Sequence, residues 1–134
     1  MKKILVFGTF DGLHPGHLNF LQQAAKLGQV FVVVARDANV VHIKARKSHF
    51  SERSRLLKVA KVPNVFYARL GSQENFLQPI IEIEPDIIAL GFDQKTFTPN
   101  ELKTKLRKIN LAPKIIRLKS FQPEKYKSSL LPKK

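Results

Sequence analysis

Five short apolar runs, separated by stretches with helical spacing, constrain the fold of this 134-residue chain more than any other feature. The runs are rich in valine, isoleucine and leucine, and they cover residues 3–8, 30–35, 64–70, 86–91 and 114–119. Continuous apolar runs of this length are typical of strands that are buried on both faces of a parallel sheet. The sequence therefore predicts five parallel strands.

The stretches between these runs predict helices at residues 15–27, 51–61, 73–84 and 99–109. Gly28 and Pro85 end the first and third of these helices, and Thr98 with Pro99 begins the fourth. The second helix is expected to turn three residues inward, Leu56, Leu57 and Ala60. The third carries its apolar residues at positions 76, 77, 80 and 81, and residues 37–50 are expected to form a loop.

Strands that alternate with helices in this order predict an α/β fold, because parallel strands joined by right-handed crossovers form a doubly wound sheet with helices on both faces. The length fits one domain over residues 1–134, without repeats or a low-complexity linker. Ligands of such sheets bind beyond the carboxyl ends of the strands. We therefore expect the functional residues among positions 8–11, 35–36, 91–93 and 119–121.

The charge of the chain restricts its partners. It holds 24 Lys and Arg against 10 Asp and Glu, a net charge of +14. Seven basic residues and one acid lie in residues 44–61, and eleven basic residues and one acid lie in residues 103–134. A field of this sign attracts polyanions such as nucleotides or nucleic acid, although a solvated basic surface explains the same composition.

Other features of the composition exclude whole classes of protein. No apolar run approaches the roughly 18–20 residues of a membrane helix, so we expect no membrane partner. The absence of cysteine excludes disulfides, thiolate metal sites and cysteine nucleophiles. These observations favour a cytoplasmic protein.

The stretch FGTFDGLHPGHLNF, residues 7–20, follows the first strand and places two of the four histidines three residues apart. Pro15 suits the first helical position, which makes His14 the N-cap and His17 the third helical residue. Free backbone N–H groups and the helix dipole make this first turn a binding place for anions. The alternative is a helix start with two incidental histidines, but their position at the first strand end favours a site that handles phosphate. There, imidazole donors can stabilise charge that grows in a transition state.

The motif G-T-F-D-G-L-H-P-G-H resembles the HxGH signature of the nucleotidyltransferase superfamily, in its cytidylyltransferase-like branch. The segments VVARD (33–37), K-x-R-K (44–47) and SERSRLL (51–57) follow that branch in order. Two further segments, PDIIALGFDQ (85–94) and EKYKSSLL (124–131), resemble archaeal-type FAD synthetases. The resemblance implies a Rossmann-like fold and transfer of a nucleoside monophosphate from a triphosphate to a phosphate acceptor, with ATP and FMN giving FAD and pyrophosphate.

The resemblance also assigns residues. It implies catalytic roles for His14, His17 and Lys44, and contacts with the acceptor for Asp11, Lys44 and Arg53. Asp11 has the alternative role of ordering the turn, and Lys44 is equally explained as a solvated lysine. The nucleotide contacts that it implies are Gly8, Thr9, Phe10, His14, Pro15, Gly16, His17, Gly91, Asp93, Tyr126, Ser128 and Ser129. Mg²⁺ is expected to arrive with the triphosphate, held by phosphate oxygens and water rather than by protein ligands.

Three alternatives stay open at this level. The C-terminal segment reads FQPEKYKSS where cytidylyltransferases carry an R-T-E-G-I-S-T-S type signature, which favours the FAD-synthetase-like group over a CTP-dependent enzyme that acts on glycerol 3-phosphate or another phosphorylated alcohol. The basic charge allows a nucleic-acid-binding protein, against which stands the lack of a stacking platform or binding motif. The third alternative is a catalytically dead relative, against which stands the intact pair of His14 and His17. The resemblance also implies a homodimer, with an interface expected at the valine-rich second strand and the loop 37–50.

Overall fold

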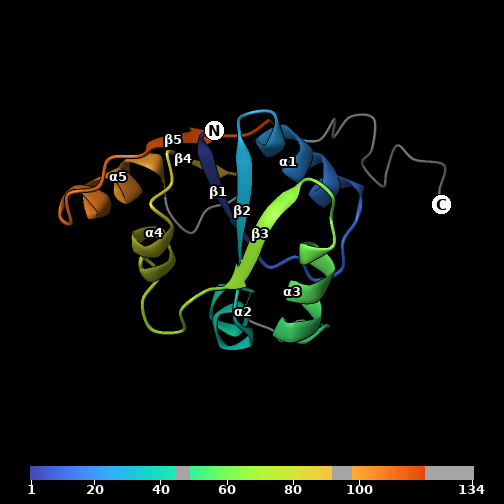
Figure 1. The fold of residues 1–134 in the computed structure, drawn as a ribbon. Helices are drawn as coiled ribbons and strands as arrows, with labels where there is room; N and C mark the ends of the chain where they lie inside the picture. The colour runs from blue at the N-terminus through green and yellow to red at the C-terminus, as the bar shows by residue number, and fades with distance from the viewer. Residues whose placement is uncertain (45–48, 92–97, 120–134) are drawn as a thin grey trace.

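The computed structural model describes residues 1–44, 49–91 and 98–119. Five parallel strands form one sheet in the order β3-β2-β1-β4-β5 (Figure 1). They are β1 (Lys3–Gly8), β2 (Gln29–Val34), β3 (Val65–Leu70), β4 (Ile87–Leu90) and β5 (Lys114–Arg117). The predicted sheet is thus confirmed. Because the strand order reverses beside β1, the carboxyl ends of β1 and β4 border the crevice where such sheets bind ligands.

Helices cover both faces of this sheet, as the doubly wound prediction requires. They are α1 (Pro15–Ala25), α2 (Asp37–Lys44), α3 (Glu52–Ala60), α4 (Gln78–Ile83) and α5 (Pro99–Arg107). Figure 1 shows α1 and α3 on one side of the sheet, and α4 and α5 on the other. None of the helices in the described part of the chain is long and apolar enough to cross a membrane.

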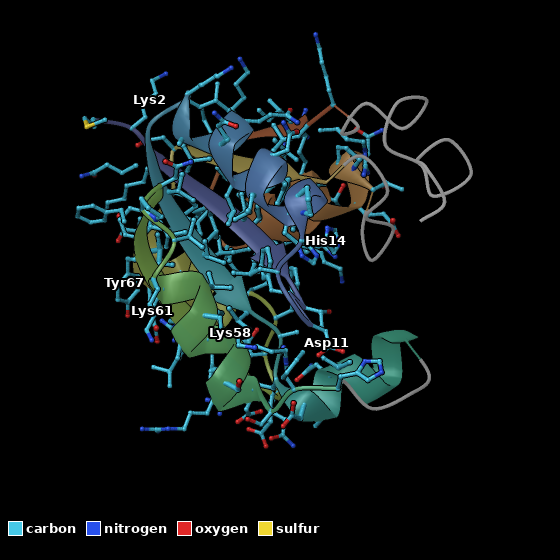
Figure 2. All side chains as sticks on the ribbon, turned by 90° about the vertical axis from the view of Figure 1, so that its right-hand side faces the viewer. Lys2, Asp11, His14, Lys58, Lys61 and Tyr67 are labelled. Atoms are coloured by element: carbon cyan, nitrogen blue, oxygen red, sulfur yellow. The ribbon has the colours of Figure 1, made fainter. Side chains whose placement is uncertain are left out.

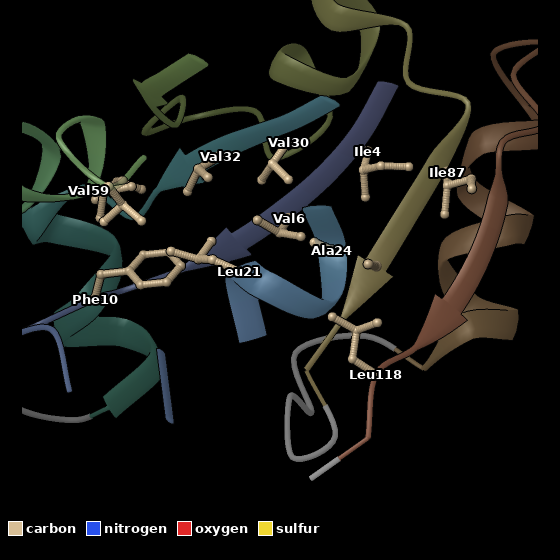
Figure 3. Packing of buried hydrophobic residues seen from close by; sticks show 13 residues of the cluster. Ile4, Val6, Phe10, Leu21, Ala24, Val30, Val32, Val59, Ile87 and Leu118 are labelled. Carbon is tan, nitrogen blue, oxygen red and sulfur yellow. The ribbon is translucent and has the colours of Figure 1, made fainter. Parts of the chain in front are cut away.

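Alternate residues of the central strands point to opposite faces of the sheet and pack into two hydrophobic cores, one on each face. Ile4 and Val6 of β1 pack with α1 and α3 on one face (Figure 3), whereas Leu5 packs with α4 and α5 on the other. The side chains of all three are fully buried. This explains why the strands read as continuous apolar runs instead of alternating ones.

The prediction of a loop at residues 37–50 is wrong for the first eight of these positions, because they form α2. The segment holds several β-branched residues, which are weak helix formers, so its sequence alone gives no helical signal. Tertiary contacts decide instead. Val40 is fully buried, and the N–H of Asp37 at the start of the helix donates to the Glu52 carboxylate at 2.9 Å.

The interface predicted at the second strand is also wrong, because β2 lies between β1 and β3. Its valines, 30, 32, 33 and 34, are buried inside the protomer and present no surface to a second copy. The exposed strand at this side of the sheet is β3. Two of its aromatic side chains remain open to solvent, Phe66 at 61% and Tyr67 at 47% exposure.

Two helices present a different face from the one expected. In α3, Leu57 and Ala60 point to solvent, and the buried residues are Arg55 and Val59. In α4, Ile81 is 40% exposed, whereas the neighbouring Ile80 is fully buried.

The start of α4 differs from the prediction as well: it begins at Gln78, five residues later than expected. In the residues before it, the Asn75 N–H donates to the Ser72 hydroxyl and the Leu77 N–H donates to the Asn75 side chain. Such local side-chain bonds satisfy the backbone without a helix.

Candidate active site

The turn that connects β1 to α1 has the capping geometry that the sequence predicts. His14 is the N-cap residue in an extended conformation, and its Nδ1 accepts the N–H of Gly16 at 3.0 Å. Pro15 occupies the first helical position, and His17 is the third helical residue. Because Nδ1 of His14 acts as the acceptor, this hydrogen bond places the proton of the neutral ring on Nε2, which is then a donor.

The two histidine rings lie against each other on the first turn of α1, and Figure 2 labels His14 at the start of this helix. Their centroids are 3.7 Å apart with an angle of 23° between the planes. His14 is exposed and His17 is partly buried. The rings of His17 and Phe10 pack in a T-shaped arrangement with their centroids 5.3 Å apart. The histidine pair therefore lies at the start of α1, where the helix dipole favours negative charge.

Phe10 anchors the turn in the core. Its side chain is 3% exposed, and its backbone has the left-handed φ of 54° that residues other than glycine rarely adopt. A Cβ atom on Gly8 would lie 2.5 Å from Cε2 of this ring. Gly8 is one of the predicted nucleotide contacts. On the side where its Cβ would project, the space is filled by the ring of Phe10. A residue at φ > 0 held in place by tertiary contacts is common at functional sites.

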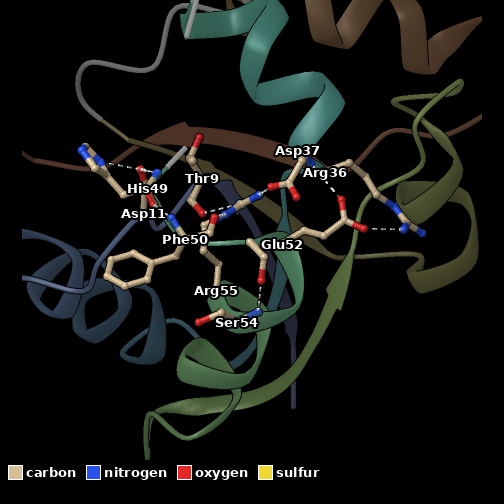
Figure 4. A network of polar contacts seen from close by, with 10 residues as sticks. Thr9, Asp11, Arg36, Asp37, His49, Phe50, Glu52, Ser54 and Arg55 are labelled. Atoms are coloured by element: carbon tan, nitrogen blue, oxygen red, sulfur yellow. Dashed lines mark hydrogen bonds and ion pairs between the residues drawn. The ribbon is translucent and has the colours of Figure 1, made fainter. Parts of the chain in front are cut away.

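Asp11 ties this turn to the residues that precede α3 (Figure 4). Its carboxylate accepts the N–H of His49 at 2.7 Å and the N–H of Phe50 at 2.9 Å, and it lies 3.3 Å from Nδ1 of His49. Burial opposes ionisation, but these hydrogen bonds outweigh it and hold the pKa of Asp11 below its ordinary value. The carboxylate is thus ionised and occupied by backbone donors.

Arg55 is a functional candidate that the sequence interpretation missed. It is fully buried, and its guanidinium donates to the Phe50 carbonyl at 3.1 Å, to the Thr9 carbonyl at 2.8 Å and to the Asp37 carboxylate at 2.7 Å (Figure 4). The interpretation named Arg53 instead, which lies exposed on α3. The available signal was spacing: Arg55 lies four residues before the buried Val59, on the same helix face.

A second arginine braces the ends of β2 and β3. Arg36 donates to the Gly71 carbonyl at 2.7 Å and to the Glu52 carboxylate at 3.2 Å, while the other oxygen of Glu52 accepts the N–H of Asp37. Side chains of α3 therefore reach the turn after β1 and the start of α2. The carboxyl edge of the sheet is held together by these buried and half-buried charges.

Of the other predicted site residues, Gly91 is described by the structure, and the remaining ones lie partly or wholly outside the described residues. Gly91 follows β4 directly and its carbonyl accepts a hydrogen bond from Arg117 at 2.7 Å, so it lies at the same edge of the sheet as the histidine turn. Lys44 ends α2, but its side chain lies outside the described part of the structure. Four more predicted contacts also lie outside the described residues: Asp93, Tyr126, Ser128 and Ser129. Among the residues that are described, no group of three or more His, Asp or Glu side chains could hold a metal ion.

The chain is similar to known proteins over nearly its whole length. The model of the family described as "Cytidylyltransferase-like" matches residues 5–134. An FAD synthase of Methanolacinia petrolearia is 42% identical over 130 residues, which are 96% of this chain and 86% of the relative. An FAD synthase of Methanosarcina barkeri is 46% identical over 119 residues, covering 88% of this chain and 84% of the relative.

Solved structures agree with these sequence matches. A lipopolysaccharide core biosynthesis protein from Thermoplasma volcanium superposes with a TM-score of 0.85 at 36% identity, over 91% of this chain and 99% of the other. A universal stress protein from Archaeoglobus fulgidus, at 14% identity and a TM-score of 0.51, shares the fold alone. The histidine turn at the end of β1 and the match to the family model over residues 5–134 lead to one assignment: the chain belongs to the cytidylyltransferase-like family.

Proposed function

We propose that this protein is an FMN adenylyltransferase, which transfers the AMP moiety of ATP to the phosphate of FMN and releases pyrophosphate. The observation that carries the proposal is the stacked pair His14 and His17 on the first turn of α1, in a chain 42% identical to an FAD synthase over 96% of its length. The name of that relative supplies the substrates. The stacked pair at the start of α1 supports the assignment of this turn to the phosphates.

The reaction needs no covalent intermediate on the protein. A phosphate oxygen of FMN attacks the α-phosphorus of ATP, and the bond from that phosphorus to the oxygen that bridges to the β-phosphate breaks. The leaving oxygen keeps the bonding electrons and departs as pyrophosphate. Negative charge increases on the non-bridging α-oxygens and on the leaving group, so donors placed at those oxygens accelerate the step.

The first turn of α1 supplies such donors. The Nε2–H of His14 is available as a donor, because Nδ1 already accepts the Gly16 N–H, and the helix dipole adds positive potential at the start of α1. Because the rings of His14 and His17 are stacked and the ring of Phe10 packs against His17, the histidine rings are held before the substrate arrives. Preorganised donors of this kind need no rearrangement in the transition state.

The proposal extends to the other components. Mg²⁺ enters with ATP on phosphate oxygens, which neutralises charge without a dedicated protein cage. Lys44 and Arg53 are assigned to the acceptor, and Gly91 and Asp93 to the nucleoside. We place the protein in the cytoplasm, because its proposed substrate ATP is available there. The net charge of +14 serves to attract these anionic substrates.

A homodimer through the free edge of β3 is the remaining part of the proposal. The exposed Phe66 and Tyr67 support it. A second copy that adds strand to strand would bury both rings. Sedimentation velocity of the protein and of its Phe66→Glu variant tests this contact, since only the unmodified chain should sediment as a dimer.

A four-way assay tests the function. Pyrophosphate release is measured with ATP or CTP, each combined with FMN or glycerol 3-phosphate, in the presence of Mg²⁺. We expect turnover with ATP and FMN, and FAD as the second product. Turnover only with CTP and glycerol 3-phosphate would replace the proposal with a cytidylyltransferase. In the productive combination, His14→Ala is expected to lower kcat by about 10²–10³-fold, and an unchanged kcat would remove the histidine from the mechanism.

A further inference from the structure

Two side chains from distant parts of the sequence hold the backbone of the same residue, Phe50, beside the active-site turn. The N–H of Phe50 donates to the Asp11 carboxylate at 2.9 Å, and the carbonyl of Phe50 accepts from Nε of Arg55 at 3.1 Å. Arg55 also donates to the Thr9 carbonyl at 2.8 Å, only two residues from Asp11. The contacts therefore close a ring that runs through the turn, the segment 49–50 and helix α3 (Figure 4).

We propose that Arg55 and Asp11 are positioning residues of the transfer reaction, which fix the turn after β1 against the segment 49–55. The inference rests on the proposed function, because it concerns the reaction assigned to that turn. Neither residue has to touch a substrate. Both act through the backbone that presents His14 and the start of α1.

The burial of Arg55 and the hydrogen bonds that both side chains already make within the protein support this role. Arg55 is fully buried, so it is not available to a substrate, and its three donor bonds end on two carbonyls and one carboxylate. Both oxygens of Asp11 accept backbone N–H groups from residues 49 and 50. A carboxylate at this place would also repel a phosphate acceptor, whereas it stabilises the segment that it binds. The geometry thus favours the turn-ordering role of Asp11 over contact with the acceptor.

The hydrogen bonds that Arg55 and Asp11 make to Thr9, His49 and Phe50 are called the clamp below. The clamp acts next to Phe10, the residue of the turn whose backbone and side chain are most restricted. The carbonyl and the N–H of one trans peptide point in opposite directions, so the bond from Arg55 to the Thr9 carbonyl also fixes the direction of the Phe10 N–H. Phe10 itself has a φ of 54° and a buried ring that contacts His17. A change in the tilt of this peptide is therefore transmitted to the catalytic histidines. Displacements of about 1 Å in such arrangements can lower rates by roughly 10²-fold.

The chain offers a matched control for Arg55. Arg69 of β3 also pairs with a carboxylate, that of Glu82, and donates to a carbonyl, that of Leu70 at 3.2 Å. Its contacts with Leu70 and Glu82 link β3 to α4, away from the turn after β1. The variants Arg55→Lys and Arg69→Lys both keep the positive charge and lose the forked donor geometry. Only the first is expected to disturb the reaction.

The experiment compares the two lysine variants by urea unfolding, by steady-state kinetics with ATP and FMN, and by hydrogen exchange. We expect both to lose stability, but only Arg55→Lys to lower kcat, by about 10–100-fold, with a smaller change in the KM for ATP. Exchange at the amides of residues 9–12 and 49–50 should accelerate in Arg55→Lys and not in Arg69→Lys. If Arg55→Lys does not fold, Asp11→Asn replaces it, because it keeps the volume and one acceptor oxygen.

Two results would overturn the inference. One is a folded Arg55→Lys with the kcat of the unmodified enzyme, and the other is an equal loss of kcat in Arg69→Lys. If the unmodified protein does not turn over ATP with FMN, the proposed function has failed, and the positioning role fails with it as stated. Unchanged hydrogen exchange at residues 9–12 and 49–50 in the Arg55 variant would overturn the clamp alone, whatever the substrate is.

Discussion

The contact between Gly8 and the ring of Phe10 leads to a quantitative test of how the turn is built. Gly8 does not have a positive φ, so its backbone accepts alanine without strain. The added methyl group, however, would lie 2.5 Å from Cε2 and 2.7 Å from Cζ of Phe10. This is about 1 Å closer than an ordinary carbon–carbon contact of roughly 3.5 Å. Gly8→Ala therefore forces the ring, or the turn that carries it, to move.

The ring has little room to move, because Phe10 is 3% exposed and packs against His17 and Phe20. Overpacking of this kind costs about 1–3 kcal/mol of unfolding free energy. For a domain of this size, 1 kcal/mol corresponds to roughly 4 °C in Tm, so a decrease of about 4–12 °C is expected. Because Phe10 contacts His17, we also expect kcat/KM to fall by on the order of 10²-fold.

Two other glycines provide the controls. A Cβ on Gly28 would lie 2.3 Å from the Lys2 carbonyl oxygen, at the opposite end of the sheet. Gly28→Ala should lower the stability by about 3 kcal/mol and leave the kcat of the folded fraction unchanged. A Cβ on Gly71, at the end of β3, would lie 3.2 Å from a methyl group of Val33. Gly71→Ala should alter the unfolding free energy by about 0.5 kcal/mol or less.

The assay combines thermal unfolding by circular dichroism with the rate of FAD formation for each variant. A Gly8→Ala protein with unchanged Tm and unchanged kcat/KM would refute the reasoning. A finer check is the double variant of Gly8→Ala with Phe10→Leu, in which the ring is absent. In that background the alanine at position 8 should cost less than about 1 kcal/mol, because the two substitutions share one contact and are not additive.

Two further predictions concern the charged and capped parts of the chain. Because the folded pKa of Asp11 lies below its ordinary value of about 3.9, its contribution to stability is present above that pH and is lost as the pH falls through the folded pKa. Urea unfolding of the protein and of Asp11→Asn should therefore differ by the same amount from pH 7 down to about pH 4. Below that pH the two should converge as the pH falls through the folded pKa, and a constant difference would contradict this role. Thr98 and Glu101 form a capping box at the start of α5, so Thr98→Ala should cost about 0.5–2 kcal/mol of unfolding free energy without a change in kcat; a loss of activity in the folded variant would show that α5 contributes to the site.

Much of the fold and part of the site could be predicted from the sequence, because these features depend on neighbouring residues. The apolar run at residues 3–8 matches β1, and Pro15 after His14 gives the start of α1 and the N-cap as predicted. A proline at the first helical position and a side chain that caps it are decided within a few residues. The order of strands and helices then leaves few topologies, since crossovers are right-handed.

The rest depends on residues that are far apart in the chain. The spacing from Val59 puts Arg55 on the buried face of α3, but the sequence around it does not show that a charged side chain can turn inward there. It does so because the Thr9 carbonyl, 46 positions away, and the Asp37 carboxylate meet its donors. In the same way, the helix at residues 37–44 forms where local propensity favours a loop, with its first N–H bound by Glu52.

The sequence by itself thus determined the parallel sheet, the helix start at His14 and the location of the histidine pair. Only the tertiary structure decided that Gly8 makes room for the Phe10 ring, that Asp11 binds backbone N–H groups and that Arg55 is buried. The physical reason is that a strand run or a helix cap is stabilised by its own segment. A buried charge is stabilised only when acceptors from other segments surround it.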